Sequence, residues 1–205
     1  MNTPRRTILI LTIAALAASV IAPSAGAATS GTSCGYKAFS EPFLPWEDSG
    51  DYVLAKSGNF DGGANGWALK NGAKLVSGGN TLLNSSAKSL YLPVGSYATS
   101  PPTCIETNFP YARMFATTTI PDAAQTDTLR VDVTYTDAVY KKTVTEPAGV
   151  ISQTSGWTPS PTLTLPKPEN IKPDGAGRLF VVYKFTPLYR SAWKIDDFYV
   201  DPKRR

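Results

Sequence analysis

A succession of short β-prone runs, each followed by turn residues, constrains the fold of this chain more than any other sequence feature. In the run 128–136, apolar residues from Leu129 to Tyr135 alternate with polar ones, which is typical of a strand with one buried face. Further β-prone runs lie at 52–55, 67–69, 73–76, 89–93, 97–100, 112–119, 139–144, 149–152, 178–186 and 193–200. Because no amphipathic helix accompanies them, the pattern predicts an all-β chain folded as a single antiparallel β-sandwich.

Two local features refine this prediction. The runs 67–69 and 73–76 flank the turn dipeptide Asn71-Gly72, so we expect them to pair as a hairpin. In the last run, strict alternation would place Ile195 and Phe198 on opposite faces of a sheet. If both residues are in the core, the pair Asp196-Asp197 between them marks a β-bulge or a local bend.

The first 27 residues have the pattern of a secretory signal peptide. Arg5 and Arg6 precede an apolar run at 7–20, and the small residues at 25–27 fit a cleavage site. A retained membrane anchor is the alternative, but the apolar run is short and Pro23 follows it directly. We therefore expect export, cleavage after residue 27, and a secreted mature chain without a membrane span.

The region 28–205 suits one domain with a sizeable core. Its beginning, 28–51, mixes aromatic residues with proline and is expected to lie over the core as an irregular segment, and the Pro-rich stretch 154–174 is expected to form a long loop. Of the formal net charge of +4, Arg5 and Arg6 supply two charges and the tail 203–205 supplies three. The body is thus close to neutral, which argues against a nucleic-acid partner.

The chain has two cysteines, Cys34 and Cys104. In an exported chain with an even number of cysteines, a disulfide is the expected pairing. A redox pair or a thiol nucleophile is the alternative, but the chain has no CxxC spacing and no histidine that could activate a thiolate.

Two motifs at opposite ends of this region resemble a known family. The first is Gly58-Asn59-Phe60-Asp61-x-x-x-Asn65-Gly66-Trp67, and the second is Trp193-x-Ile195-Asp196-Asp197-Phe198-x-Val200. Together they resemble the jelly-roll carbohydrate-binding modules of the galactose-binding-like type. The whole chain also resembles a group of small exported actinobacterial proteins, which implies no particular activity.

The resemblance implies a jelly-roll sandwich and a structural calcium ion. The family's ligands correspond to Asp61 and to Asp196 or Asp197, which together with main-chain carbonyls would clamp the two ends of the domain. Asp61 stands where the family usually has the longer glutamate. In the alternative interpretation, Asp61 stabilises the turn before Gly62, and Asp196 and Asp197 cap the bulge.

Sugar binding requires exposed aromatic side chains that stack on pyranose rings, with polar groups nearby. Trp67 and Trp193 lie inside the family motifs and are expected in the core. The candidates for a binding platform lie beside turns or prolines and are Trp46, Trp157, Tyr111, Tyr140 and Tyr189. Alternatively, the two tryptophans of this set cover the edges of the sandwich.

The composition argues against most enzyme classes. The absence of histidine excludes Ser-His-Asp triads, Cys-His pairs and His-ligated metals. No pair of carboxylates lies in a recognisable glycosidase motif, and the acidic cluster at 47–51 is expected to be a solvated turn.

The leading hypothesis is a secreted, non-catalytic protein that binds a polysaccharide or a cell-envelope ligand. A structural or interaction protein of the cell exterior without a small ligand is the first alternative. A hydrolase with an unfamiliar carboxylate site, marked by a buried acidic pair in a deep pocket, is the second.

Overall fold

A computed structural model describes residues 34–83, 86–105, 111–119, 127–165, 167–176 and 178–201. They belong to one compact unit that spans 31–205. The predicted signal peptide at 1–27 lies outside the described residues. In the part of the chain that is described, no helix is long and apolar enough to cross a membrane.

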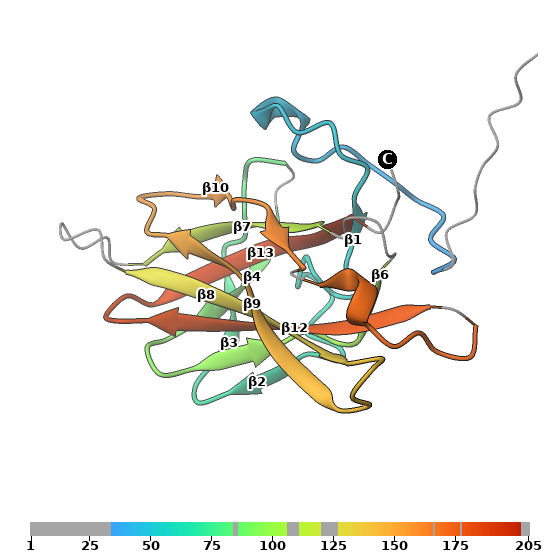
Figure 1. Cartoon of the computed structure of the whole chain (residues 1–205). Coiled ribbons are helices and arrows are strands. Elements are labelled where there is room, and N and C mark those ends of the chain that lie inside the picture. Colours follow the sequence, from blue (N-terminus) through green and yellow to red (C-terminus); the bar gives the residue numbers. More distant parts are fainter. Residues whose placement is uncertain are drawn as a thin grey trace, which may run out of the picture. The chain divides into compact units, whose positions relative to one another are not determined.

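Two antiparallel sheets pack face to face as a β-sandwich, as predicted (Figure 1). The seven-stranded sheet has the order β10 (Thr158–Pro159), β7 (Tyr111–Thr118), β13 (Trp193–Asp201), β4 (Lys88–Leu92) and β3 (Lys74–Ser77), with β1 (Val53–Leu54) paired to β13 and β11 (Leu163–Thr164) paired to β7. The six-stranded sheet has the order β2 (Ala68–Lys70), β5 (Tyr97–Thr99), β12 (Leu179–Leu188), β8 (Thr128–Thr136) and β9 (Thr143–Ser152), with β6 (Thr103–Ile105) paired to β12. The structure also has two short 3-10 helices: η1 (Leu44–Trp46) precedes β1, and η2 (Pro168–Asn170) lies between β11 and β12.

The main core lies between the two sheets and contains the aromatic residues of both motifs. Phe60 and Phe198 contact Trp67 edge-on, with ring centroids 5.0 and 6.0 Å away. Trp67 and Trp193 are buried, as predicted. Because aromatic side chains bury the largest apolar areas, contacts between residues so far apart in sequence join the two ends of the domain.

The predicted bulge in the last strand is confirmed. The register of β13 against β7 shifts between Asp196 and Tyr199, and Asp197 adopts a left-handed φ of 47°. The extra residue allows Ile195 and Phe198 to face the same core.

Two predictions about strands were wrong. The runs around Asn71-Gly72 do not form a hairpin, because β2 pairs with β5 and β3 pairs with β4, so the turn connects the two sheets. The runs 139–144 and 149–152 are not two strands, because β9 is continuous from Thr143 to Ser152. A register shift opposite Pro147 keeps this edge strand paired although proline lacks an amide hydrogen.

The Pro-rich stretch 154–174 is not simply a loop. Its two-residue strands β10 and β11 pair with β7, where proline is tolerated because an edge strand uses only some of its amides. Leu163, Leu165 and Ile171 from the same stretch are buried in the main core. The stretch therefore closes one side of the sandwich.

The N-terminal segment 34–52 lies along the outer face of the seven-stranded sheet (Figure 1). Cys34 and Cys104 form the predicted disulfide, with Cα atoms 5.7 Å apart. Ser40 and Tyr52 pair through two main-chain hydrogen bonds of 3.0 and 2.8 Å. The segment is thus fixed at its start by the disulfide and at its end by β1.

Candidate functional site

A second hydrophobic cluster, on the outer face of the seven-stranded sheet, positions the candidate site. Phe43 is fully buried there, stacked on Phe115 with ring centroids 5.3 Å apart and in edge contact with Tyr52 and Tyr199. Phe115 and Tyr199 point outward because their neighbours on β7 and β13 occupy the main core. The cluster fixes the turn at 44–50 over the sheet.

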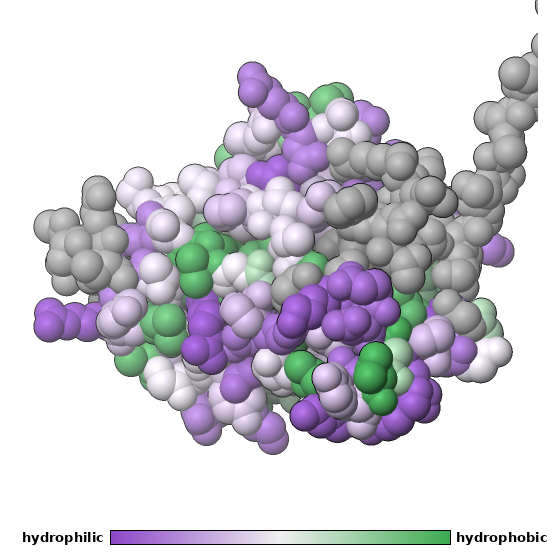
Figure 2. All heavy atoms as spheres, in the orientation of Figure 1, coloured by the Kyte–Doolittle hydropathy of each residue, from purple (hydrophilic) through white to green (hydrophobic). Residues whose placement is uncertain are grey.

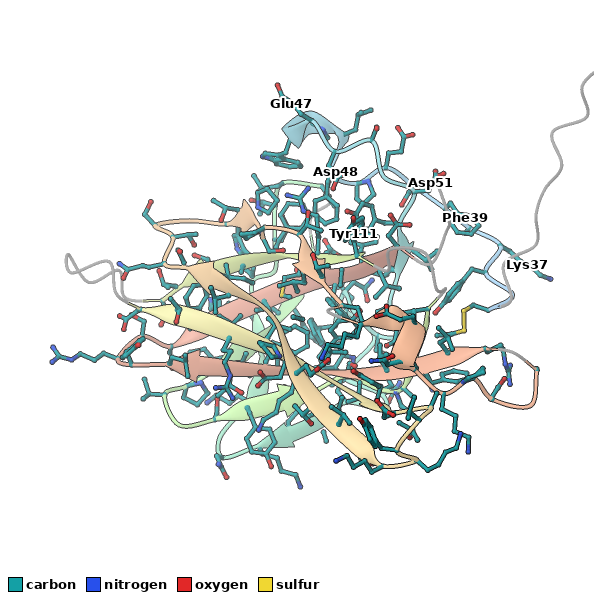
Figure 3. The ribbon with its side chains drawn as sticks, viewed as in Figure 1. Lys37, Phe39, Glu47, Asp48, Asp51 and Tyr111 are labelled. Atoms are coloured by element: carbon teal, nitrogen blue, oxygen red, sulfur yellow. A yellow bond between two sulfur atoms is a disulfide. The ribbon has the colours of Figure 1, made fainter. Side chains whose placement is uncertain are left out.

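A pocket of about 500 Å³ lies between this turn and β7. It is lined by Glu47, Asp48, Ser49, Tyr52, Tyr111, Arg113, Pro161, Thr162 and Thr164. Carboxylates, hydroxyls, one guanidinium group and a tyrosine ring therefore meet in one concavity. In Figure 3, Asp48 and Tyr111 lie between the turn and the sheet, whereas Glu47 points outward from the turn.

Asp48 and Arg113 form the polar centre of the pocket. The Arg113 guanidinium donates to Asp48 Oδ2 at 2.8 Å, and its Nε donates to the carbonyl of Ser160 at 3.0 Å. The guanidinium also lies over the ring of Phe43, 4.4 Å from its centroid. An arginine held on three sides has little conformational freedom left to lose when a ligand binds.

The ionisation of Asp48 follows from the same contacts. Burial alone would raise its pKa, but hydrogen bonds from Tyr52, Arg113 and the Gly50 amide outweigh burial and hold the pKa below its ordinary value. Burial, and then the hydrogen bond to Asp48, raises the pKa of Tyr52. At neutral pH the pocket thus contains an ionised carboxylate, an arginine and a protonated tyrosine in fixed positions.

Three of the five aromatic candidates, Tyr111, Trp46 and Trp157, pack against the second hydrophobic cluster. Tyr111 also lines the pocket, whereas Trp46 and Trp157 are half-buried and are not among the residues that line it. Tyr140 and Tyr189 are exposed at two other turns and do not join them. The interpretation that Trp46 and Trp157 cover part of the sandwich agrees with their half-buried state.

Sequence reasoning missed the polar centre. The acidic turn at 47–51 was expected to be solvated, but Asp48 is tied into the network of Tyr52 and Arg113. Arg113 was not singled out, although a charged residue between apolar neighbours in a β-prone run was a detectable signal. Only the tertiary structure places it opposite a carboxylate 65 residues away.

The three predicted metal ligands lie near one another around the residues 79–88. Asp196 and Asp197 accept hydrogen bonds of 2.7 Å from the main-chain and side-chain amides of Asn80. Asp61 Oδ1 accepts hydrogen bonds from the Ala87 and Lys88 amides at 2.8 and 3.0 Å. Carboxylates from both ends of the domain are thus joined by hydrogen bonds to one segment of the chain.

The chemistry of this carboxylate cluster fits a cation in part. Burial and the charge of Asp197 raise the pKa of Asp196 to about 7, and no ion pair among the described residues neutralises either group. Within the same residues, however, no group of three acidic or cysteine side chains is arranged to hold a metal. Asp196 Oδ1 also accepts the Asp197 amide at 2.8 Å, which is the predicted capping of the bulge.

The buried acidic pair Asp196-Asp197 does not line the pocket beside β7. The observation that would favour a hydrolase, a buried acidic pair inside a deep pocket, is therefore not met at this pocket.

No protein-family model matches the sequence, and no curated protein matches it. The similar solved structures include three that contain CBM22 modules. The CBM22-1–GH10 modules of Clostridium thermocellum endo-1,4-beta-D-xylanase 10B, in complex with xylohexaose, match with a TM-score of 0.52 and 15% identity over 74% of this chain and 28% of that chain. A xylan-binding domain from CBM22 matches with a TM-score of 0.50 and 16% identity over 76% and 96% of the two chains.

The CBM22-1–CBM22-2 tandem domain of Paenibacillus barcinonensis Xyn10C matches with a TM-score of 0.51 and 12% identity over 76% of this chain and 46% of that chain. This chain thus spans less than a third of the first of these structures and less than half of the tandem domain. At such low identity the similarity concerns the fold alone. The chain has the jelly-roll β-sandwich fold of carbohydrate-binding modules.

Proposed function

We propose that this chain is a secreted, non-catalytic carbohydrate-binding protein and that the pocket beside β7 holds its polysaccharide ligand. The observation that carries the proposal is the meeting of Tyr111 with the fixed Asp48–Arg113 pair in one concavity. The jelly-roll fold supports it, as does the predicted signal peptide. A volume of about 500 Å³ has the size of ordinary small-ligand sites.

The pocket offers the contacts that a sugar requires. Asp48 can accept a hydrogen bond from a hydroxyl group, and an arginine such as Arg113 can donate to a neighbouring one. The ring of Tyr111 offers an apolar surface for stacking and a hydroxyl at its edge. Because the protein already holds these groups in place, the binding cost lies mainly in desolvation.

The test is a titration of tryptophan fluorescence with soluble polysaccharides, beginning with xylan because xylan-binding modules share the fold. Trp46 directly precedes Glu47 and Asp48, which line the pocket, so occupancy is expected to shift its emission. Tyr111→Ala is expected to weaken binding at least ten-fold, which corresponds to one aromatic contact of about 1.4 kcal/mol. Tyr189→Ala, an exposed tyrosine outside the pocket, is the matched control and is expected to bind like the parent.

Equal binding by the two tyrosine variants would place the ligand elsewhere. Failure of every polysaccharide to bind would favour the alternative of an extracellular structural or interaction protein. In that case a concentration-dependent oligomer, measured by sedimentation, is the expected finding.

We also propose that the carboxylate cluster of Asp61, Asp196 and Asp197 binds calcium, with Asn80 and main-chain carbonyls as further oxygen ligands. The support is the donor chemistry and the buried negative charge of Asp196 and Asp197. A bound Ca²⁺ would neutralise this charge and fasten the two ends of the domain. Because the Asn80 side-chain amide donates to Asp197 and its oxygen accepts the Leu82 amide at 2.7 Å, this side chain has to turn to offer its oxygen to the ion.

Thermal unfolding with Ca²⁺ or EDTA tests this second proposal. Ca²⁺ is expected to raise the Tm, and Asp197→Asn is expected to abolish that response. Asp174→Asn, which changes a carboxylate in an exposed turn, is the control and is expected to retain it. The calcium proposal would be refuted if calorimetry detected no heat of binding and EDTA left the Tm unchanged.

A further inference from the structure

The turn between β8 and β9 is a rigid tip that displays two apolar side chains. The Asp137 carboxylate accepts the amides of Val139 and Tyr140 at 2.8 and 2.7 Å. The Ala138 amide donates to the Asn170 carbonyl at 2.7 Å, which braces the tip against η2. The main chain is therefore fixed on both sides, while the side chains that it carries face solvent.

Val139 and Tyr140 are the most exposed large hydrophobic residues that the structure describes, at 69% and 71%. Single exposed apolar residues are common on protein surfaces, but two adjacent ones at a braced tip form a small protruding patch. Figure 2 shows hydrophobic residues beside strongly hydrophilic ones at this end of the β8–β9 hairpin. Nothing in the fold requires apolar residues at this position.

The charges around the patch are mainly positive. Lys141 and Lys142 follow Tyr140 directly, and Lys142 lies over the tyrosine ring, 5.2 Å from its centroid. Lys172, whose amide donates to the Thr136 carbonyl at 2.7 Å, adds a third exposed cation beside the tip.

The acidic groups nearby are fewer or already engaged. The carboxylate of Asp137 is buried and accepts amides, and Glu146 pairs with Lys167 at 3.5 Å. Glu169 on η2 is the remaining exposed carboxylate of the elements packed against the tip. The tip therefore presents net positive charge around an apolar centre.

We propose that this tip, Val139–Lys142 with Lys172, docks on an anionic phospholipid membrane. Valine and tyrosine enter the interfacial region of the bilayer, and the lysines contact the acidic headgroups. The combination favours a membrane over a soluble polyanion because a polyanion offers no apolar phase to Val139. The site is independent of the pocket beside β7 and lies on the other sheet.

The test uses a fluorophore that reports only from the tip. Both native cysteines are in the disulfide, so Val139→Cys can be labelled with a polarity-sensitive nitrobenzoxadiazole dye in the otherwise unchanged full chain. Equimolar vesicles of phosphatidylcholine and phosphatidylglycerol are expected to shift its emission to the blue. Lys141→Gln with Lys142→Gln is expected to weaken binding roughly 30-fold, since each lysine near an anionic surface contributes about 1 kcal/mol.

The matched control is the same dye at Tyr189→Cys. Tyr189 is almost as exposed, but it follows Leu188, which pairs with Thr128 at the opposite end of β8. Its emission is expected to remain unchanged even if another part of the chain binds lipid. Replacement of both lysines by arginine is expected to preserve the response at position 139.

Three results would overturn the proposal. The first is an unchanged dye emission at position 139 when vesicles are added, and the second is an equal emission shift at position 189. The third is a response at position 139 that soluble polyphosphate reproduces, which would assign the tip to a polyanion instead of a membrane.

Discussion

Phe43 holds the N-terminal segment, and therefore the turn with Glu47 and Asp48, on the sheet. It is fully buried and contacts three aromatic rings and the Arg113 guanidinium. Truncation of a buried phenylalanine to alanine destabilises a protein by about 3–5 kcal/mol, depending on how far the cavity collapses. Because the segment is irregular and can close part of the cavity, we expect Phe43→Ala to lower the free energy of unfolding by about 3 kcal/mol.

Urea denaturation followed by circular dichroism measures this loss. With an m-value of about 2 kcal/mol/M, the midpoint is expected to fall by about 1.5 M. Trp46, in edge contact with Phe115, is expected to shift its emission to the red in the variant before the main transition. The neighbouring variant Leu44→Ala is the control, because Leu44 is exposed and its truncation is expected to change stability by less than about 0.5 kcal/mol.

Equal midpoints for Phe43→Ala and Leu44→Ala would refute this reasoning. The segment would then be held by the disulfide and β1 alone, and the pocket would not depend on the aromatic cluster.

Three further predictions concern stability. In thermal melts, Gly58→Ala is expected to destabilise the fold by about 1–3 kcal/mol, because a Cβ at this position would lie 2.6 Å from the main-chain oxygen of Phe198 in β13. Gly62→Ala is the control and is expected to leave the stability unchanged, because a Cβ there has open space around it. Replacement of both Cys34 and Cys104 by serine is expected to cost about 4 kcal/mol in urea denaturation, since the bond closes a loop with a sequence separation of 70, and reducing agent should then have no further effect. The folded-state pKa of Asp48 is lowered, so its stabilising contribution is complete above the unfolded-state value of about 4 and is lost as the pH falls through the folded-state pKa. The stability difference between the parent and Asp48→Asn is therefore expected to shrink on acidification, and a difference that grows toward low pH would contradict the assignment.

Much of the fold was predictable because its signals are local. Alternation in 128–136 reports a strand with one buried face, and the spacing of Ile195 and Phe198 indicated the bulge at Asp196-Asp197. The pairing of Cys34 with Cys104 followed from the cysteine count and an expected export. Each of these inferences uses residues whose chemistry permits few alternatives.

Strand pairing was less predictable because neighbouring strands are selected by the whole core. The turn at Asn71-Gly72 has a sequence suited to a hairpin, yet β2 and β3 separate into different sheets, where β2 pairs with β5 and β3 pairs with β4. The runs 139–144 and 149–152 were expected as separate strands, but β9 continues through Pro147 with a register shift in this edge strand. The local preference of a turn or strand sequence is overridden when burial of side chains in the tertiary structure stabilises another pairing more strongly.

The sequence by itself determined the all-β character, the two motifs that meet in the core, the disulfide, and which aromatic residues could form a platform. Only the tertiary structure decided that Tyr111, Trp46 and Trp157 pack against one cluster while Tyr140 and Tyr189 do not, and that Asp48 meets Arg113 beside Tyr111. The physical reason is the sequence distance over which each interaction acts. Backbone preferences and side-chain alternation act over a few residues, whereas a binding site depends on contacts between segments that are brought together only when the core closes.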